Sequence, residues 1–177
     1  MKSLFRLEYF FVISLMDFSL MDQFRKEVNW KAFEGVPKVI VAAEKESSEE
    51  ASQWGHKLQA KFNAKSHPQK DHVHTLQPGE KVKIIAVASL PDVPNFFKGI
   101  FFKRFQKKHS HMGMLLDFDH RLSKGLGFKN LDKVPGIAIL PPSSSKPVEP
   151  LLFYGLSSDA DLKKIVFQTI SEAIVKK

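Results

Sequence analysis

The chain has 177 residues, of which 43% are hydrophobic and 26% are charged, a composition typical of one globular domain and not of a disordered segment. It contains no cysteine, which excludes a disulfide framework, a cysteine-ligated metal and every mechanism that needs a thiol. The formal net charge of +8 favours acidic partners such as nucleic acid, anionic lipid or an acidic protein surface. Because no nucleic-acid-binding motif accompanies this charge, we expect a solvated basic surface and no specific nucleic-acid binding.

The first 15 residues are predicted to form an N-terminal extension to one domain that covers residues 16–177. They contain an apolar run that is interrupted or closed by charged residues, namely Arg6, Glu8 and Asp17. The run is too short and too charged to span a membrane, and no small-residue cleavage site follows it. We favour an added helix or strand, or a start at Met16 or Met21, over a signal peptide. We also favour a cytoplasmic location over a periplasmic or secreted one.

Short apolar runs alternate with amphipathic segments along the domain. The first run, at residues 38–43, is rich in β-branched residues, which is typical of a strand buried on both faces. Strands are predicted at residues 38–43, 81–89, 112–118, 136–140 and 151–154. Helices are predicted at residues 48–63, 92–108 and 121–126, and from residue 157 onward. The alternation predicts parallel strands joined by right-handed crossovers, and the last two strands form a hairpin that adds antiparallel pairs. We therefore expect an α/β fold with a central mixed sheet flanked by helices.

The predicted helix at 48–63 begins with a capping box. Ser47 is expected to cap the first turn, and Glu50 lies three residues further along the chain. No G-x-S-x-G motif surrounds Ser47 or Ser48, and a capping hydroxyl is already occupied by the backbone. We therefore expect neither serine to be a catalytic nucleophile.

The predicted helix at 92–108 combines phenylalanines with basic residues. Its expected core face consists of apolar residues at helical spacing: Phe96, Phe97, Ile100, Phe101 and Phe105. Its other side carries five basic residues: Lys98, Lys103, Arg104, Lys107 and Lys108. We expect an amphipathic helix that packs its phenylalanines on the sheet. The alternative is a surface for anionic lipid or a nucleic-acid backbone, which Phe102 favours because it lies off the apolar stripe.

Two groups of side chains resemble metal ligands. The polar loop after residue 64 contains His67, Asp71, His72 and His74. Imidazoles suit zinc and copper, but this spacing matches no established site, and we expect exposed loop histidines. Asp117 and Asp119 are expected to end a strand and cap the next helix rather than to bind magnesium. We therefore predict no metal and no cofactor.

Four places along the chain match the sequence patterns of one known family. They are residues 18–23 (FSLMDQ), 33–41 (FEGVPKVIV), 115–119 (LLDFD) with 126–128 (LGF), and 134–139 (VPGIAI). Together they resemble the alkyl hydroperoxide reductase/thiol-specific antioxidant (redoxin, peroxiredoxin-like) branch of the thioredoxin superfamily. The resemblance covers about residues 16–175 and implies a thioredoxin-like fold with an extra N-terminal segment.

The resemblance also implies where the family's chemistry would lie. The reactive cysteine of the family stands at the amino end of the first central helix, where this chain has Ser47 or Ser48. A serine cannot pass through sulfenic and disulfide states, and the acidic residues around it would raise the pKa of a thiol. The resemblance further implies a cis peptide bond at Val134–Pro135 beside this position.

We therefore interpret the chain as a non-catalytic binding or interaction module of unknown ligand, for which a protein or peptide is the candidate partner. The vestigial cleft expected to hold this partner is formed by Ser47, Ser48, Val134 and Pro135. One alternative is an antioxidant or oxidoreductase-family enzyme with non-thiol chemistry. The other is a protein that binds anionic lipid or nucleic acid through the five basic residues of the helix at 92–108.

Overall fold

A computed structural model describes residues 14–15, 18–64, 73–109, 113–142 and 149–175. Its elements are, in chain order, β1 (Met21–Asp22), the 3₁₀ helix η2 (Trp30–Phe33), β2 (Lys38–Ala43), α1 (Ser48–Phe62), β3 (Lys83–Leu90), α2 (Asn95–Lys108), β4 (Leu115–Phe118), α3 (Arg121–Gly125), β5 (Gly136–Leu140), β6 (Leu151–Tyr154) and α4 (Ala160–Val175). Most of the predicted N-terminal extension lies outside the described residues, whereas Leu15 is buried in the core.

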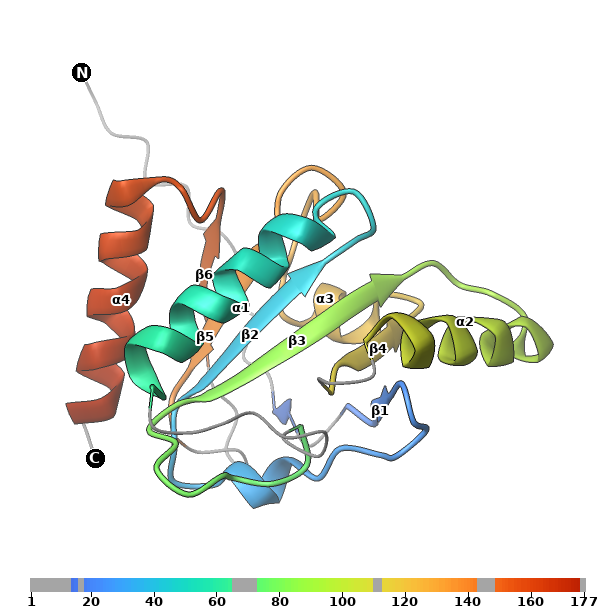
Figure 1. Cartoon of the computed structure of the whole chain (residues 1–177), viewed down its shortest axis with the longest axis horizontal. Coiled ribbons are helices and arrows are strands. Elements are labelled where there is room, and N and C mark those ends of the chain that lie inside the picture. The colour runs from blue at the N-terminus through green and yellow to red at the C-terminus, as the bar shows by residue number, and fades with distance from the viewer. Residues whose placement is uncertain (1–13, 16–17, 65–72, 110–112, 143–148, 176–177) are drawn as a thin grey trace.

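One six-stranded sheet has the order β1-β4-β3-β2-β5-β6 (Figure 1). The strands β2, β3 and β4 are parallel, and the hairpin of β5 and β6 adds antiparallel pairs next to β2. β1 pairs antiparallel with β4 at the other edge. This arrangement confirms the predicted mixed sheet, and it brings the carboxyl ends of β2, β3 and β4 to the same edge.

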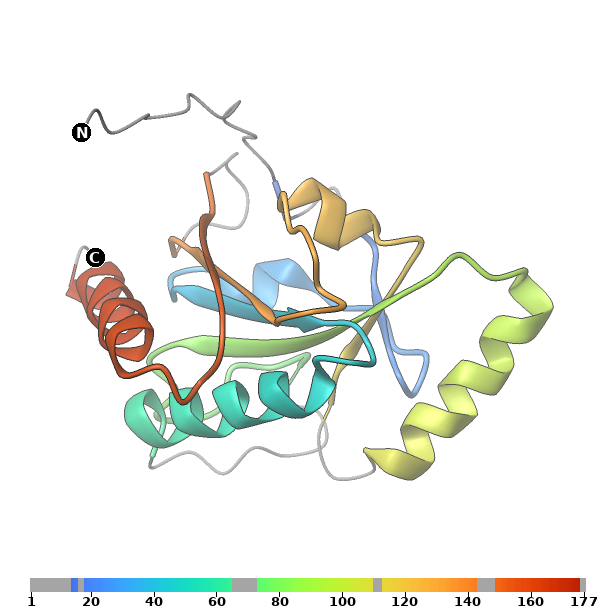
Figure 2. The same cartoon turned by 90° about the horizontal axis from the view of Figure 1, so that it is seen from above.

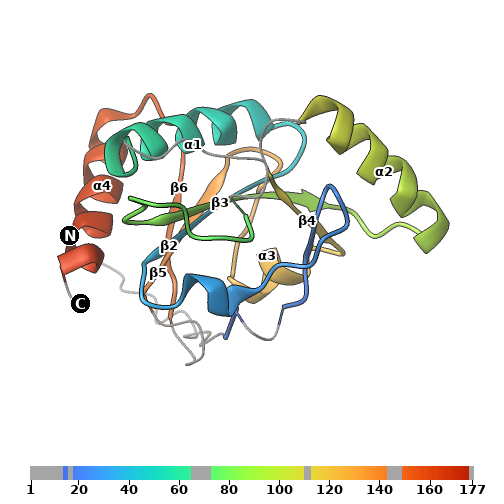
Figure 3. The ribbon, with the colours of Figure 1, turned by 60° about the horizontal axis from the view of Figure 1, so that its bottom comes forward.

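Helices cover both faces of the sheet, as Figure 3 shows. α1 and α4 cover one face, where Trp54, Leu58, Val166 and Ile170 pack on the sheet. η2 and α3 cover the other face in a larger cluster. The central strand β2 is therefore enclosed on both sides, and all six of its residues are buried. A run of β-branched and small apolar residues suits such a strand, as predicted.

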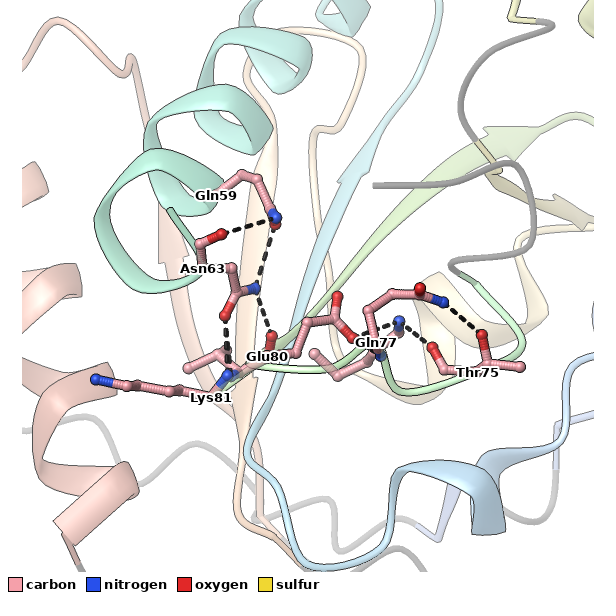
Figure 4. A network of polar contacts seen from close by, with 8 residues as sticks. Gln59, Asn63, Thr75, Gln77, Glu80 and Lys81 are labelled. Atoms are coloured by element: carbon pink, nitrogen blue, oxygen red, sulfur yellow. Dashed lines mark hydrogen bonds and ion pairs between the residues drawn. The ribbon is translucent and has the colours of Figure 1, made fainter. Parts of the chain in front are cut away.

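The carboxyl end of α1 is fixed to the start of β3 by a buried amide. The Asn63 Nδ2 donates to the Val82 carbonyl at 2.8 Å, and the Asn63 Oδ1 accepts from the Lys81 amide at 3.0 Å. The Glu80 carboxylate accepts from the Gln77 amide at 2.8 Å in the same network (Figure 4). These bonds satisfy backbone groups that α1 and β3 leave unpaired, so the crossover has a defined geometry.

α2 stands apart from the other helices, beyond the part of the sheet that α1 and α4 cover (Figure 2). It covers Asn95–Lys108, close to the predicted bounds. β5 and β6 have the predicted bounds, whereas β4 begins at Leu115 instead of residue 112, which lies outside the described residues. None of the helices in the described part of the chain combines the length and the apolar character needed to cross a lipid bilayer.

Candidate functional site

The amino end of α1 is the position that the family resemblance assigns to chemistry. Ser47 is only 4% exposed, and its hydroxyl donates a hydrogen bond to the carbonyl of Leu131. The exposed Ser48 donates to the Lys45 carbonyl at 2.7 Å. Neither hydroxyl accepts a bond from the first turn of α1, so the predicted capping box is wrong. The loop before β5 brings the Leu131 carbonyl to this place, and a buried carbonyl needs a donor.

Glu50, the other half of the predicted capping box, also bonds outside its own helix. Its carboxylate accepts a hydrogen bond from the Ser157 amide. On the same side of α1, the Trp54 indole donates to the Gly155 carbonyl at 2.9 Å, and the Lys57 ammonium donates to the Ser157 carbonyl at 2.7 Å. The first turns of α1 are therefore fixed to the loop between β6 and α4. Glu50, which was expected to take part in the capping box, connects α1 to this loop instead.

The peptide bond between Val134 and Pro135 is trans, as are all the described peptide bonds, so the predicted cis bond is wrong. The preceding turn reverses the chain before the proline: Asn130 is in the left-handed region (φ 55°), and its carbonyl accepts from the amides of Lys133 and Val134. A chain that has already turned can enter β5 with the trans bond, which is favoured by about 0.5–1 kcal/mol.

The surroundings of the predicted cleft are tightly packed. Gly136, which follows Pro135, pairs with Ala42 at the carboxyl end of β2. A Cβ at Gly136 would lie 2.5 Å from the ring of Phe128 and 2.9 Å from Leu131. Two hollows of about 320 and 260 Å³ occur along α4 and the end of α1, and none of the four predicted cleft residues lines them. The cleft of Ser47, Ser48, Val134 and Pro135 stays a prediction.

A chain of polar side chains that the sequence analysis missed lies at the carboxyl ends of β3 and β4. The Ser89 hydroxyl lies 2.6 Å from Nδ1 of His120 and 3.1 Å from the hydroxyl of Ser123. Ser123 donates to the Asp117 carboxylate at 2.6 Å. The parallel pairing places Ser89 opposite Asp117. The available signal in the sequence was that both residues lie at the carboxyl ends of predicted strands, at 81–89 and 112–118.

This polar chain has a structural role. The Asp117 carboxylate accepts from the amides of Leu122 at 2.9 Å and Ser123 at 2.8 Å, so it caps α3 as expected. Ser89 and Ser123 are both buried, and their hydroxyls bond within the network. A nucleophile must reach its substrate, and neither hydroxyl is open to one.

The side chains that resemble metal ligands do not converge in the part of the chain that the structure describes. His67, Asp71 and His72 lie outside the described residues. His74 is buried rather than exposed, with its Nε2 2.8 Å from the Asp22 carboxylate. Among the described residues, no group of three or more His, Asp or Glu side chains is arranged to hold a metal ion.

Asp119 instead faces Asp92 in the loop before α2. A hydrogen bond with Asp119 and the charge of that carboxylate raise the pKa of the exposed Asp92.

The helix α2 exposes the side that was expected to pack on the sheet. Three of its apolar residues have large exposed fractions: 76% for Phe96, 44% for Phe97 and 61% for Ile100. Phe102, which was expected to lie off the packed side, is only 8% exposed and packs with Leu90 and Leu116. The predicted orientation of α2 is therefore wrong for these four residues, although Phe101 and Phe105 are partly buried as expected.

Contacts outside the helix select this orientation. The Arg25 guanidinium lies 5.2 Å from the centre of the Phe102 ring, a cation–π contact that holds this side of α2 against the turn after β1. The Gln106 side chain donates to the Gln23 carbonyl at 2.8 Å on the same side. α2 is therefore held to the body of the protein by one narrow side, and the opposite side faces solvent.

Four of the five predicted anion-binding residues lie on the exposed side of α2: Lys103, Arg104, Lys107 and Lys108. The fifth, Lys98, is half-buried, with its ammonium 5.1 Å from the centre of the Phe118 ring. Within the described ranges the four exposed residues form no ion pair, and α2 contains no acidic residue. We call these four residues together with Phe96, Phe97 and Ile100 the outer face of α2.

Comparison with known proteins identifies the fold. No protein-family model matches the chain, and no curated protein matches it either. Among solved structures, BsSco, a member of the Sco family of cytochrome c oxidase assembly proteins, has a TM-score of 0.55 at 11% identity, with 97% of this chain and 99% of that chain covered.

Two further structures carry the names of redox proteins. The exposed lipoprotein thioredoxin of Streptococcus pneumoniae has a TM-score of 0.53 at 19% identity, with 88% of this chain and 98% of that chain covered. Peroxiredoxin Q of Xanthomonas campestris has a TM-score of 0.52 at 14% identity, with 89% and 92% covered. These likenesses confirm the thioredoxin-like α/β fold and place a peroxiredoxin among the structural neighbours of a chain without cysteine.

Proposed function

We propose that the chain is a non-catalytic binding protein built on the thioredoxin-like fold. The observation that carries this proposal is the lack of a reactive side chain at the amino end of α1. The chain has no thiol, and the Ser47 hydroxyl is buried and bonded to the Leu131 carbonyl. A protein that keeps this fold without a nucleophile at this position retains its surfaces as the means of acting on other molecules.

The outer face of α2 is the surface that best supports binding. Apolar side chains with exposed fractions above two fifths are adjacent on one helix here, and the rings of Phe96 and Phe97 are 4.2 Å apart. An exposed apolar patch beside charged residues is typical of an interaction site. Binding of a peptide beside Pro135 is the weaker candidate, because Phe128 and Leu131 fill the space next to Gly136.

A turnover assay tests the non-catalytic role. The full chain, stripped of metal, is incubated with hydrogen peroxide or with a disulfide substrate and a thiol reductant, and a cysteine-containing peroxiredoxin serves as the positive control. We expect the same background rate for the wild-type protein, for Ser47→Ala and for buffer alone. Turnover by the wild-type protein that disappears in Ser47→Ala would overturn the proposal.

A further inference from the structure

We infer that the outer face of α2 docks the protein on the surface of a bilayer that contains anionic lipids. This inference rests on the proposed binding role, since it names the partner of the same surface. An interfacial site of this kind needs apolar side chains that enter the boundary between head groups and acyl chains, and cations that meet the lipid phosphates. The outer face of α2 supplies both.

The apolar and basic side chains share one side of the helix, in two consecutive parts. Phe96, Ile100, Lys103 and Lys107 follow one another at steps of four, three and four residues, which places them in one stripe. The apolar members occupy the first turns of α2, and the basic members occupy the last turns. On a flat surface, the first turns enter the apolar boundary while the last turns lie at the level of the phosphates.

The charge on this surface is not neutralised within the described part of the chain. α2 has no acidic residue, and Lys103, Arg104, Lys107 and Lys108 are exposed without an ion-pair partner there. Lysine and arginine also have long apolar stems that lie along an interface while the charged group stays in water. Four such cations on one helix attract a negatively charged surface, and salt screens this attraction.

Contacts on the opposite side of α2 hold the helix in place, so the outer face is a fixed surface. Phe102 packs with Leu90 and Leu116, and the Arg25 guanidinium covers its ring at 5.2 Å. α2 stands apart from α1 and α4 in both views (Figures 1 and 2), so a flat partner can approach α2 without meeting these two helices. The outer face therefore needs no rearrangement of the core to be presented.

A lipid surface fits these residues better than a nucleic acid does. The four cations alone suit a phosphate backbone, but Phe96 and Ile100 would then stay in water or face phosphates, because they lie on the same side as the cations. A bilayer surface accepts both kinds of side chain at once. The apolar residues therefore distinguish the two partners, and the experiment uses them.

Vesicle co-sedimentation of the full chain tests the inference. The probes are vesicles of phosphatidylcholine alone and vesicles with about 30% phosphatidylserine, at about 0.05 and 0.5 M salt. We expect binding to the anionic vesicles only, with a loss of about tenfold or more at the higher salt. We expect Phe96→Ser with Ile100→Ser, and separately Lys103→Glu with Lys107→Glu, each to lower the partition constant by about tenfold or more.

Matched control variants change exposed apolar residues and exposed lysines elsewhere in the chain. Ile165→Ser with Val175→Ser removes two residues of α4 that are 52% and 82% exposed, and Lys61→Glu with Lys81→Glu reverses two exposed charges. We expect both control pairs to bind as the wild-type protein does. Thermal unfolding of every variant checks that the fold is intact.

Three results would overturn the inference. The first is the absence of binding to anionic vesicles at low salt. The second is binding that Phe96→Ser with Ile100→Ser leaves unchanged while oligonucleotide binding depends on the lysines. The third is a dimer that this apolar pair of substitutions dissociates, with no vesicle binding, which would show that a second copy covers the face. If the protein neither binds vesicles nor turns over peroxide, only the lipid partner is refuted. If it turns over peroxide and Ser47→Ala abolishes this turnover, the proposed non-catalytic function is refuted.

Discussion

The amino end of α1 and the outer face of α2 differ in which kinds of side chain they bury and which they expose. At α1, Ser47 lies at one of the two positions that the resemblance matches to a reactive cysteine; it is buried, and its hydroxyl bonds to a loop 84 residues away in sequence. At α2, phenylalanine and isoleucine, which normally lie in the core, are exposed beside four cations that have no ion-pair partner among the described residues. This difference is the reason for proposing the outer face of α2, and not the amino end of α1, as the binding surface.

The largest expected effect concerns which side of α2 supports the fold. Phe102→Ala should lower the free energy of unfolding by about 3 kcal/mol, because it leaves a cavity beside Leu90 and Leu116. Phe96→Ala should change it by no more than about 0.5 kcal/mol, since that ring is 76% exposed. Urea unfolding followed by circular dichroism measures both values. Equal losses for the two variants would mean that the orientation of α2 is wrong.

A second prediction extends the comparison along β2 to its amino end, where a charge is buried. The Lys38 ammonium donates to the carbonyls of Val36 at 3.1 Å and Pro142 at 2.6 Å. Burial lowers the pKa of Lys38 from 10.5 to about 8, and the charge of Glu34 opposes this only in part. Between these pH values the unfolded state binds more protons than the folded state, so the free energy of unfolding should rise with pH.

The variant Lys38→Met isolates this effect. Relative to Lys38→Met, the wild-type protein should gain roughly 3 kcal/mol of stability between pH 8 and pH 10.5, and the difference should be constant below pH 8. Urea unfolding at several pH values gives the two curves. Curves that stay parallel through this range would show that Lys38 is not buried as a charged group.

A third and smaller effect tests whether the amino end of α1 is closed. The chain has no cysteine, so Ser47→Cys and Ser48→Cys each introduce a single thiol. The thiol at position 47 should react with a disulfide reagent at least about tenfold more slowly than the thiol at position 48, because Ser47 is 4% exposed and Ser48 is exposed. The two variants should react equally in urea. Equal rates in the folded proteins would mean that the site is open.

The sequence predicted the elements of this fold better than their surroundings. The apolar runs at β2 and β5 have the expected bounds, because a short strand enclosed on both faces leaves a clear apolar pattern. The edge strand β6 also has its expected bounds, although it is only partly buried. α1, at Ser48–Phe62, also lies close to its predicted bounds of 48–63, with Trp54 and Leu58 buried. In these elements local pattern and tertiary packing require the same residues.

The predictions failed where a group on another element determines the orientation of a helix or the hydrogen bond of a side chain. Phenylalanine occupies nearly every side of α2, so its spacing cannot select the packed side, and Arg25 and the sheet select Phe102 instead. Ser47 satisfied a local capping pattern, but the Leu131 carbonyl takes its hydroxyl. The turn at Asn130 likewise makes a cis bond before Pro135 unnecessary. Arg25 and Leu131 are distant in sequence from the residues that they contact, whereas Asn130 is close to Pro135.

One fluorescence measurement compares the two regions directly. Asn95→Cys lies at the start of α2 and Ser48→Cys at the start of α1; both positions are exposed, and each variant carries one environment-sensitive dye. On addition of anionic vesicles at low salt, the dye at position 95 should shift to the blue, and the dye at position 48 should keep its spectrum. A shift at position 48 with none at position 95 would contradict the conclusion that α2 is the binding surface.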